Sequence, residues 1–290
     1  MSIVKNALYI VATPLGNPGD MSRRALETLA GVDVIAAEDT RRIKRLLRHF
    51  HIGADCVSLH EHNEGQVSAQ VVKRLQAGQS VALVSDAGTP LISDPGYELI
   101  RLAQDAGVRI IPVPGPSALT AALSVAGLPN DRFVFEGFLP ARSAARIARL
   151  EQLRNEPRTL VFYEAPHRIL ATLRDMGAVF GMEREAAMAR ELTKTYETIR
   201  RDRLERLIEW VASDSEQQRG EIVVLVHGMP QTPGAAAQVD VRQLLAVLLE
   251  GRSTKEAVTL AADLTGEKRN RLYDMALAIQ EGRASKGASL

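Results

Sequence analysis

Short apolar runs alternate with amphipathic stretches through the first 127 residues of the chain. In the amphipathic stretches, apolar residues recur at the three- and four-residue spacing of a helix that packs through one face. Strands that alternate with such helices predict a mostly parallel sheet covered on both faces. The predicted strands are 8–12, 32–36, 57–59, 81–84 and 108–113, and the predicted helices are 23–30, 41–49, 66–76 and 98–106.

The pattern becomes less regular after residue 128, where partly alternating runs predict a mixed sheet. A stretch rich in Pro, Gly and Ala follows, and three amphipathic helices are predicted beyond it at 242–249, 254–264 and 268–279. The fold class is therefore α/β with a small helical addition. We expect α/β domains at 1–127 and 128–228, a linker at 229–239 and a helical domain at 240–290. The predicted strands of the second domain are 133–138, 159–163, 186–189, 197–200 and 221–226.

Composition and charge narrow the class of protein. Of the 290 residues, 46% are hydrophobic and 24% are charged, which is typical of a globular chain. One cysteine, Cys56, excludes an intrachain disulfide and a zinc site built on several cysteines. No apolar run approaches the length of a membrane span, and no signal peptide precedes the first strand, so we expect a cytoplasmic protein that binds no membrane.

The net charge is only +1, but basic residues gather locally. Such clusters are usually solvated surfaces, and three of them on a balanced chain are also compatible with a partner that has a phosphate backbone. Both interpretations stay open. The clusters are Arg41, Arg42, Lys44, Arg45 and Arg48; Arg142, Arg146 and Arg149; and Arg200, Arg201, Arg203 and Arg206.

Three loops rich in Gly and Pro follow predicted strands, at 12–20, 84–96 and 112–117. The second is longer than the roughly two to six residues usual between a strand and a helix, which favours a binding role. It carries Asp86 where a phosphate-binding loop would offer backbone amides, so a cationic ligand or ribose hydroxyls suit it better. The first loop lacks the G-x-G-x-x-G spacing of dinucleotide sites. Carboxyl ends of parallel strands share one sheet edge, so the three loops are expected to line one crevice.

These loops resemble those of the tetrapyrrole methylases, and more closely those of the family's ribosomal RNA small subunit methyltransferase I branch. The first loop has the G-x-P-G-D pattern, and the third has Pro-Gly-x-Ser. Ser85-Asp86-Ala87 stands where the broader family has Gly-Asp-Pro. This departure weakens the expectation that the substrate is a porphyrinoid. The resemblance covers nearly the whole chain, through segments 9–20, 36–41, 59–64, 85–96, 162–168 and 189–194.

The resemblance implies two α/β domains with S-adenosylmethionine held in the cleft between them. It also implies a homodimer that methylates the ribose 2′-hydroxyl of a decoding-centre cytidine in 16S ribosomal RNA, free or in the small subunit. Two alternatives stay open: a methylase of a small tetrapyrrole precursor, and a non-catalytic RNA-binding protein. Implied cofactor contacts are Pro14, Leu15, Asp86, Gly88, Thr89, Ser117, Ala118, Tyr163, Ala189 and the 224–226 strand.

Transfer to a 2′-hydroxyl needs alignment and removal of a proton. Candidate bases are Glu38, Asp39, His60, Glu164, His167 and Lys194. Each could instead be a solvated or capping residue, and Asp39 in particular could cap the helix that starts at Thr40.

Several basic residues are candidates for binding RNA phosphates, with surface ion pairs as the alternative. They are Arg41, Arg45, Arg168 and Arg190, and Lys255 and Arg269 near helix starts of the last domain. That domain would then be an RNA-binding accessory, or else a packing or dimer element. His60 and His62 lack a third ligand at a recognisable spacing, so no metal site is expected.

Overall fold

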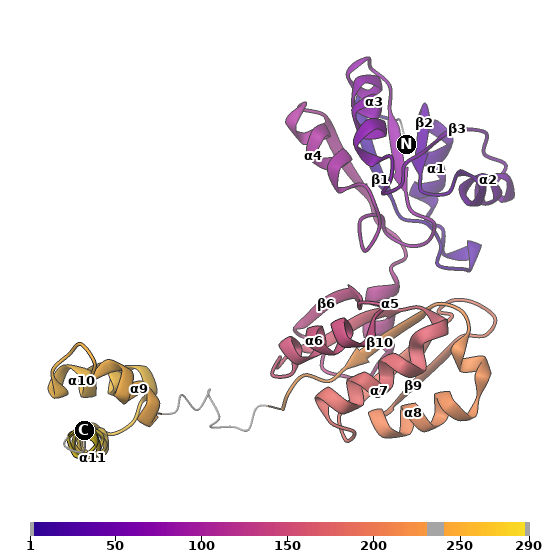
Figure 1. The fold of residues 1–290 in the computed structure, drawn as a ribbon. Coiled ribbons are helices and arrows are strands. Elements are labelled where there is room, and N and C mark those ends of the chain that lie inside the picture. Colours follow the sequence, from indigo (N-terminus) through magenta and orange to yellow (C-terminus); the bar gives the residue numbers. More distant parts are fainter. Residues whose placement is uncertain (1–2, 231–240, 288–290) are drawn as a thin grey trace. The chain divides into compact units, whose positions relative to one another are not determined.

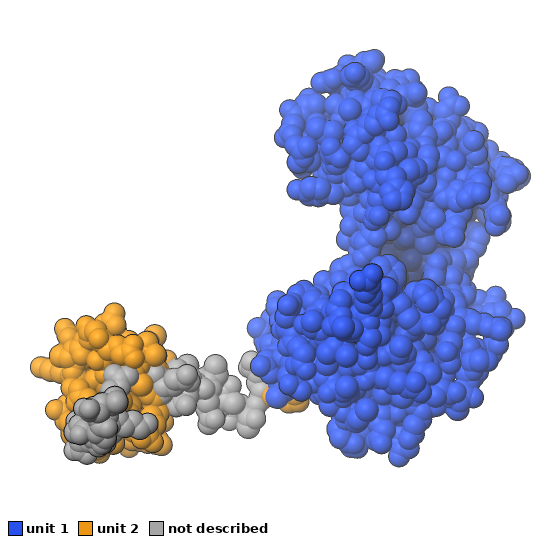
Figure 2. All heavy atoms as spheres, in the orientation of Figure 1, with its two compact units in different colours: residues 1–229 blue, residues 230–290 orange. Residues whose placement is uncertain are grey.

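The computed structural model describes residues 3–230 and 241–287. The chain forms two compact units, Met1–Met229 and Pro230–Leu290, which Figure 2 shows in different colours. Residues 231–239 of the predicted linker lie outside the described residues. The domain boundaries predicted from the sequence therefore stay predictions.

The first sheet of unit 1 has five parallel strands in the order β3-β2-β4-β1-β5 (Figure 1), which confirms the parallel sheet predicted from the sequence. Its strands are β1 (Ala7–Val11), β2 (Val34–Ala37), β3 (Asp55–Ser58), β4 (Val81–Val84) and β5 (Arg109–Val113). The helices between them are α1 (Arg23–Gly31), α2 (Thr40–His49), α3 (Glu64–Gln76) and α4 (Tyr97–Asp105), with a short 3-10 turn η1 (Pro18–Asp20).

Alternate residues of these strands enter two separate cores. Tyr9 and Ile35 pack with α1 and α2, whereas Leu8 and Leu83 pack with α3 and α4. A strand buried on both faces needs apolar residues at successive positions, which is why these strands are continuous apolar runs in the sequence. The sheet is thus enclosed, and its carboxyl edge is where loops are free to form a site.

The second sheet is mixed, as predicted, with the order β6-β7-β10-β8-β9. Strands β6 and β7 are parallel, and β10 runs antiparallel to both β7 and β8. The strands are β6 (Phe133–Phe138), β7 (Thr159–Glu164), β8 (Glu185–Arg190), β9 (Thr198–Arg203) and β10 (Ile222–Val226).

The two faces of this sheet are covered differently. Residues Phe162 and Met188 point into a large core with α6 (Ser143–Leu153), α7 (Ile169–Phe180) and α8 (Leu204–Ser213). On the other face, α5 (Ala118–Val125) packs against Val223 together with Leu15 from the loop after β1. Two 3-10 turns, η2 (Pro166–Arg168) and η3 (Ser215–Gln218), complete the unit.

The described residues of unit 2 form three helices, α9 (Val241–Leu248), α10 (Thr254–Thr265) and α11 (Arg269–Gly287). Leu245, Val258 and Leu272 belong to an apolar core within this unit. Ser253 and Glu256 form a reciprocal capping box at the start of α10, in which each side chain accepts from a backbone amide of the other residue. The last helix is longer than the predicted 268–279.

Candidate active site

The three loops after β1, β4 and β5 are joined by hydrogen bonds, as their shared sheet edge predicts. The Thr13 amide donates to the Gly88 carbonyl at 2.8 Å, and the Gly88 amide donates back at 3.0 Å. The Thr89 hydroxyl donates to the Pro116 carbonyl at 2.9 Å. Gly88 has a φ of 85°, which side chains rarely adopt, so this exchange depends on glycine.

The long loop after β4 has a strained backbone that hydrogen bonds hold in place. Leu91 and Ser93 have φ values of 75° and 69°, a conformation that costs free energy in residues other than glycine. One carboxylate oxygen of Glu64 accepts from the amides of Gly96 and Glu98, both at 2.9 Å, at the start of α4. Glu64 therefore secures the end of the loop, a role that its place in the 59–64 motif did not reveal.

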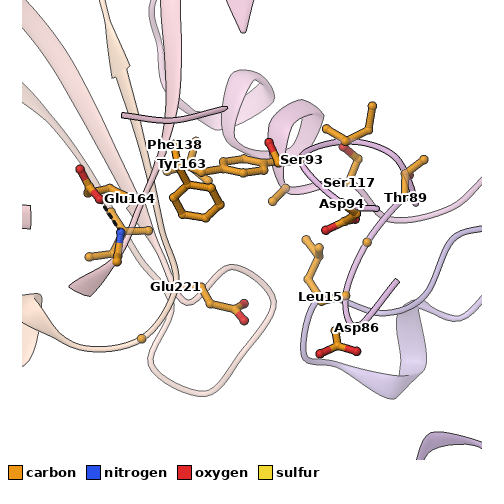
Figure 3. A pocket seen from close by; sticks show the side chains of 18 of the residues that line it. Leu15, Asp86, Thr89, Ser93, Asp94, Ser117, Phe138, Tyr163, Glu164 and Glu221 are labelled. Atoms are coloured by element: carbon orange, nitrogen blue, oxygen red, sulfur yellow. Dashed lines mark hydrogen bonds between the residues drawn. The ribbon is translucent and has the colours of Figure 1, made fainter. Parts of the chain in front are cut away.

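A cavity of about 360 Å³ lies between these loops and the second sheet (Figure 3), a size within the range of small-molecule sites. Most of its lining is aliphatic, aromatic or backbone. The lining residues are Leu15, Arg42, Asp86, Ala87, Gly88, Thr89, Ile92, Ser93, Asp94, Ser117, Ala118, Phe138, Tyr163, Glu164, Ala165, Pro166, Gly220, Glu221, Ile222 and Val223.

Two aromatic rings form one wall of the cavity, and a bulge in β6 positions one of them. The register of β6 against β7 shifts between Phe135 and Gly137, and Gly137 has a φ of 64°. A Cβ at Gly137 would lie 2.9 Å from the Ser93 hydroxyl, so glycine also allows the long loop to approach. Phe138 is 55% exposed and contacts Tyr163 edge-on, with ring centroids 5.7 Å apart. Bulges of this kind redirect side chains beside active sites.

Carboxylates give the cavity its polarity. Asp86 pairs with Arg42 at 3.1 Å and accepts from the Asp39 amide at 3.0 Å. Burial raises the pKa of Asp94 to about 6, and the carboxylates of Glu38 and Asp86 add to the rise. Burial also raises the pKa of Tyr163 to about 12, so its hydroxyl stays protonated at neutral pH.

Most of the residues expected to contact the cofactor line this cavity. They are Leu15, Asp86, Gly88, Thr89, Ser117, Ala118 and Tyr163. Ser117 precedes α5 without a capping hydrogen bond from its side chain, which leaves its hydroxyl available to a ligand. Pro14 and Ala189 do not line the cavity, and Ala189 is buried in the core with Val223. From β10, Ile222 and Val223 reach the cavity in place of the expected 224–226.

Three of the expected bases have structural partners instead. Asp39 caps α2, and hydrogen bonds from the Arg41 side chain and amide hold its pKa at about 2. Glu164, with a side chain only 1% exposed, accepts from the Ala165 amide, from Arg168 at 2.5 Å and from Thr172 at 2.6 Å.

Lys194 bonds to Glu191 at 2.7 Å and to Glu221 at 3.0 Å. Burial acts to lower the pKa of Lys194, but these bonds raise it above its ordinary value. Its stem also lies against Gly16, where a Cβ would come within 2.3 Å. A lysine held charged in this way does not accept a proton.

The other three candidates are not among the residues that line the cavity. Glu38 is half-buried, and burial and the charge of Asp86 raise its pKa. The Nδ1 atom of His60 is buried without a hydrogen-bond partner among the described residues, and its ring contacts His62 edge-on. His167 is exposed in η2.

The expected phosphate-binding residues divide into two groups. Arg168 is tied to Glu164, and Arg190, 6% exposed, donates to Gln217 at 3.2 Å and to the Tyr196 carbonyl at 3.1 Å, so both stabilise the fold. The second group lies on the surface, where Arg41 pairs with Asp39 at 2.9 Å and Arg269 lies 3.8 Å from Asp263. It consists of Arg41 and Arg45 on α2, and Lys255 and Arg269 in unit 2.

Sequence reasoning missed several residues of the cavity. Asp94 and Phe138 stood inside segments that it had singled out, but nothing in the pattern showed which way their side chains point. Arg42 was treated as one member of a surface cluster, and Glu221 as the first residue of a strand.

Among the described residues, no group of three His, Cys, Asp or Glu could hold a metal ion. No described helix is long and apolar enough to cross a membrane.

We expect the buried Glu164 to contribute to the stability of the fold. Glu164→Ala should lower the free energy of unfolding by about 3 kcal/mol or more, because it leaves Arg168 without its buried partner. Urea denaturation measures this. Glu209→Ala, which removes an exposed partner of Arg206, serves as the control and should change it by no more than about 0.5 kcal/mol. Unchanged stability in Glu164→Ala would contradict the structural role.

Two known protein families match this chain. Residues 7–208 match the family of Tetrapyrrole (Corrin/Porphyrin) Methylases, and residues 235–280 match the RsmI C-terminal HTH domain. The chain is similar to the Ribosomal RNA small subunit methyltransferase I of Pseudomonas aeruginosa, 55% identical over 94% of this chain and 97% of that one. The protein of that name from Haemophilus influenzae is 47% identical over 97% of this chain and all of its own length (100%).

Solved structures of lower identity share the fold. A diphthine synthase superimposes with a TM-score of 0.59 at 18% identity, over 76% of this chain and 90% of that one. A uroporphyrin-III C-methyltransferase from Thermus thermophilus, complexed with S-adenyl homocysteine, gives 0.55 at 17% identity, over 76% and 96%. With the two sheets, the cavity and the loops, these matches show that the chain belongs to the tetrapyrrole methylase family, together with the ribosomal RNA small subunit methyltransferase I proteins.

Proposed function

We propose that this protein transfers a methyl group from S-adenosylmethionine to the ribose 2′-hydroxyl of a cytidine at the decoding centre of 16S ribosomal RNA. The observation that carries the proposal is similarity over nearly the whole chain to small-subunit ribosomal RNA methyltransferases, 55% identity in one case. The cavity supports it, because it lies between the two sheets and has the lining that such a cofactor needs.

The residues of the cavity fit S-adenosylmethionine in shape and charge. Gly88 and Ala118 leave room for a ligand beside the loops, while Tyr163 and Val223 offer apolar surface to an adenine. The ligand carries a sulfonium and an ammonium group, and Asp86 and Glu221 supply negative charge in the lining. This donor set is better matched to a cation than to a pyrophosphate, as the Asp86 position predicted.

The residues of this chain orient the reacting groups in the cavity and keep water away from them. S-adenosylmethionine brings an activated methyl group, so the protein needs only to align the acceptor oxygen and remove its proton. The hydrogen-bonded loops and the braced backbone around Ser93 fix one wall of the cavity. Phe138 provides an exposed ring at the opposite wall, the kind of surface on which unstacked RNA bases pack.

Two other functions have less support. Several structures that share the fold act on tetrapyrroles, but at 17–20% identity they show the fold alone. Unit 2 matches a C-terminal HTH domain of the ribosomal RNA enzymes, and a small tetrapyrrole substrate would not need it. A non-catalytic RNA-binding protein would leave the cavity and its carboxylates without a role.

The proposal includes a cytoplasmic location and a homodimer. A ribosomal RNA substrate is made and assembled in the bacterial cytoplasm, which supports the location. The homodimer rests on the resemblance to the family. Light scattering on purified protein measures the mass in solution directly.

Methyl transfer to small ribosomal subunits tests the activity. Subunits from a strain that lacks ribose methylation at the decoding centre are incubated with the protein and radiolabelled S-adenosylmethionine. We expect label in 16S RNA, at one cytidine and in a form resistant to alkaline cleavage, as a blocked 2′-hydroxyl requires. Label in a base would contradict ribose methylation, and label only in added uroporphyrinogen would favour the tetrapyrrole alternative.

Cofactor binding should depend on Asp86. Asp86→Ala removes the partner of Arg42 and leaves an uncompensated cation in the cavity, so we expect at least about a tenfold weaker Kd for S-adenosylmethionine, or about 1.4 kcal/mol. Isothermal titration calorimetry measures the affinity. Asp105→Ala, an exposed change at the end of α4, is the matched control and should bind normally. Equal affinity in both variants would place the cofactor elsewhere.

RNA binding should depend on the exposed arginines of α2. Neutralising Arg41 and Arg45 together should weaken binding to the small subunit and reduce the slope of log affinity against log salt by about one to two, since each lost phosphate contact removes counterion release. Affinity for S-adenosylmethionine should not change. The control pair is Arg101 and Arg109, exposed and outside the basic clusters. A salt slope equal to that of the control pair would make this surface of α2 merely solvated.

A further inference from the structure

The acidic residues that line the cavity differ in their partners. Asp86 is paired with Arg42, Glu164 with Arg168, and Glu221 with Lys194. Asp94 is the remaining carboxylate of the lining, and it forms no ion pair with any described residue. Three of the four carboxylates are therefore held by cations, and one is left to act on a ligand.

The position of Asp94 suits a group that acts on the acceptor. It lies on the loop wall between Ser93 and the start of α4, and Figure 3 shows it across the cavity from Phe138 and Tyr163. The positive φ of Ser93 sets the backbone just before it, and Glu64 holds the backbone just after it through the Gly96 amide. A carboxylate fixed on both sides loses little further freedom when a substrate arrives.

From this arrangement we propose that Asp94 is the general base that removes the proton of the acceptor hydroxyl. The inference rests on the proposed function, because it requires a ribose hydroxyl in the cavity. The hydroxyl proton moves to a carboxylate oxygen of Asp94 as the oxygen forms its bond to the methyl carbon and the sulfur–methyl bond breaks. The sulfonium becomes a neutral thioether, and the protonated Asp94 returns its proton to water when the products leave.

The groups that face Asp94 set the pH at which it works. Glu38 after β2 and Asp86 after β4 are negative, and Tyr163 on β7 faces Asp94 as a neutral phenol. The nearby Ser85 hydroxyl donates to the Gly88 carbonyl at 3.2 Å. Arg42 on α2 is engaged by Asp86. Burial and the two carboxylates raise the pKa of Asp94 to about 6. Asp94 is then ionised at neutral pH yet more basic than an ordinary carboxylate, which favours proton abstraction.

Asp94→Asn is the direct test. It keeps the size of the side chain and removes its basicity, so the single-turnover rate of methyl transfer should fall about 10²- to 10⁴-fold. The Kd for S-adenosylmethionine, measured by calorimetry, and the affinity for small subunits should stay within about threefold of the wild type, since general-base catalysis does not act on binding. Asp105→Asn, the same change at an exposed site, should keep the wild-type rate.

The pH profile separates a base from a merely structural residue. The wild-type single-turnover rate should rise with pH through a midpoint near 6 and then level off, because Asp94 must be ionised. Glu38→Gln removes a neighbouring negative charge, lowers the pKa of Asp94 and should move the midpoint to lower pH while folding is kept. The residual rate of Asp94→Asn should lack this midpoint.

Two outcomes would overturn the assignment. A loss of cofactor affinity in Asp94→Asn that accounts for its whole loss of rate would make Asp94 a cofactor ligand instead. An unchanged midpoint in Glu38→Gln, or a midpoint that survives in Asp94→Asn, would assign the titration to another group. Failure of the proposed function is distinguishable, since the wild type itself would then transfer no methyl group to the subunit.

Discussion

The burial of Leu15 and α5 against one face of the second sheet is the interaction on which the site depends. Leu15 comes from the loop after β1, and it shares a core with Ala122 of α5 and with Val161 and Val223 of the second sheet. The loops of the first domain are thereby brought against a sheet that is not their own. Because α6, α7 and α8 occupy the opposite face, the remaining part of this face is left to form a wall of the cavity.

Rigid backbone then determines what the cavity presents. The exchange of amide hydrogen bonds between Thr13 and Gly88 joins two loops, and Thr89 joins the third. The cost of the positive φ values at Leu91 and Ser93 is offset by these bonds and by Glu64 at the start of α4. On the other wall, the bulge at Gly137 turns Phe138 toward the cavity. Conformations of this kind persist only where the surroundings over-determine them.

The charged residues of the site differ in whether the fold supplies them with hydrogen-bond or ion-pair partners. Glu164 and Arg190 looked chemical in the sequence because they are charged residues in distinctive motifs. In the fold, both are buried and fully engaged, and their charge stabilises the turns around η2 and η3. Asp94 looked like one residue of a loop, yet it is a cavity carboxylate that forms no ion pair with any residue that the structure describes. A motif shows that a residue type is required at a position, whereas its partners show what it is required for.

The sequence by itself determined the parallel and mixed sheets and the three loops at one sheet edge, whose residues Asp86, Gly88 and Ser117 line one cavity. These follow from local patterns, since apolar runs specify buried strands and the carboxyl ends of parallel strands must share an edge. Only the tertiary structure decided that Phe138 and Asp94 face each other, that Asp39 caps α2, and that Lys194 is held between Glu191 and Glu221. The physical reason is that ion pairing, burial and side-chain direction depend on segments far apart in the chain, and no local pattern records them.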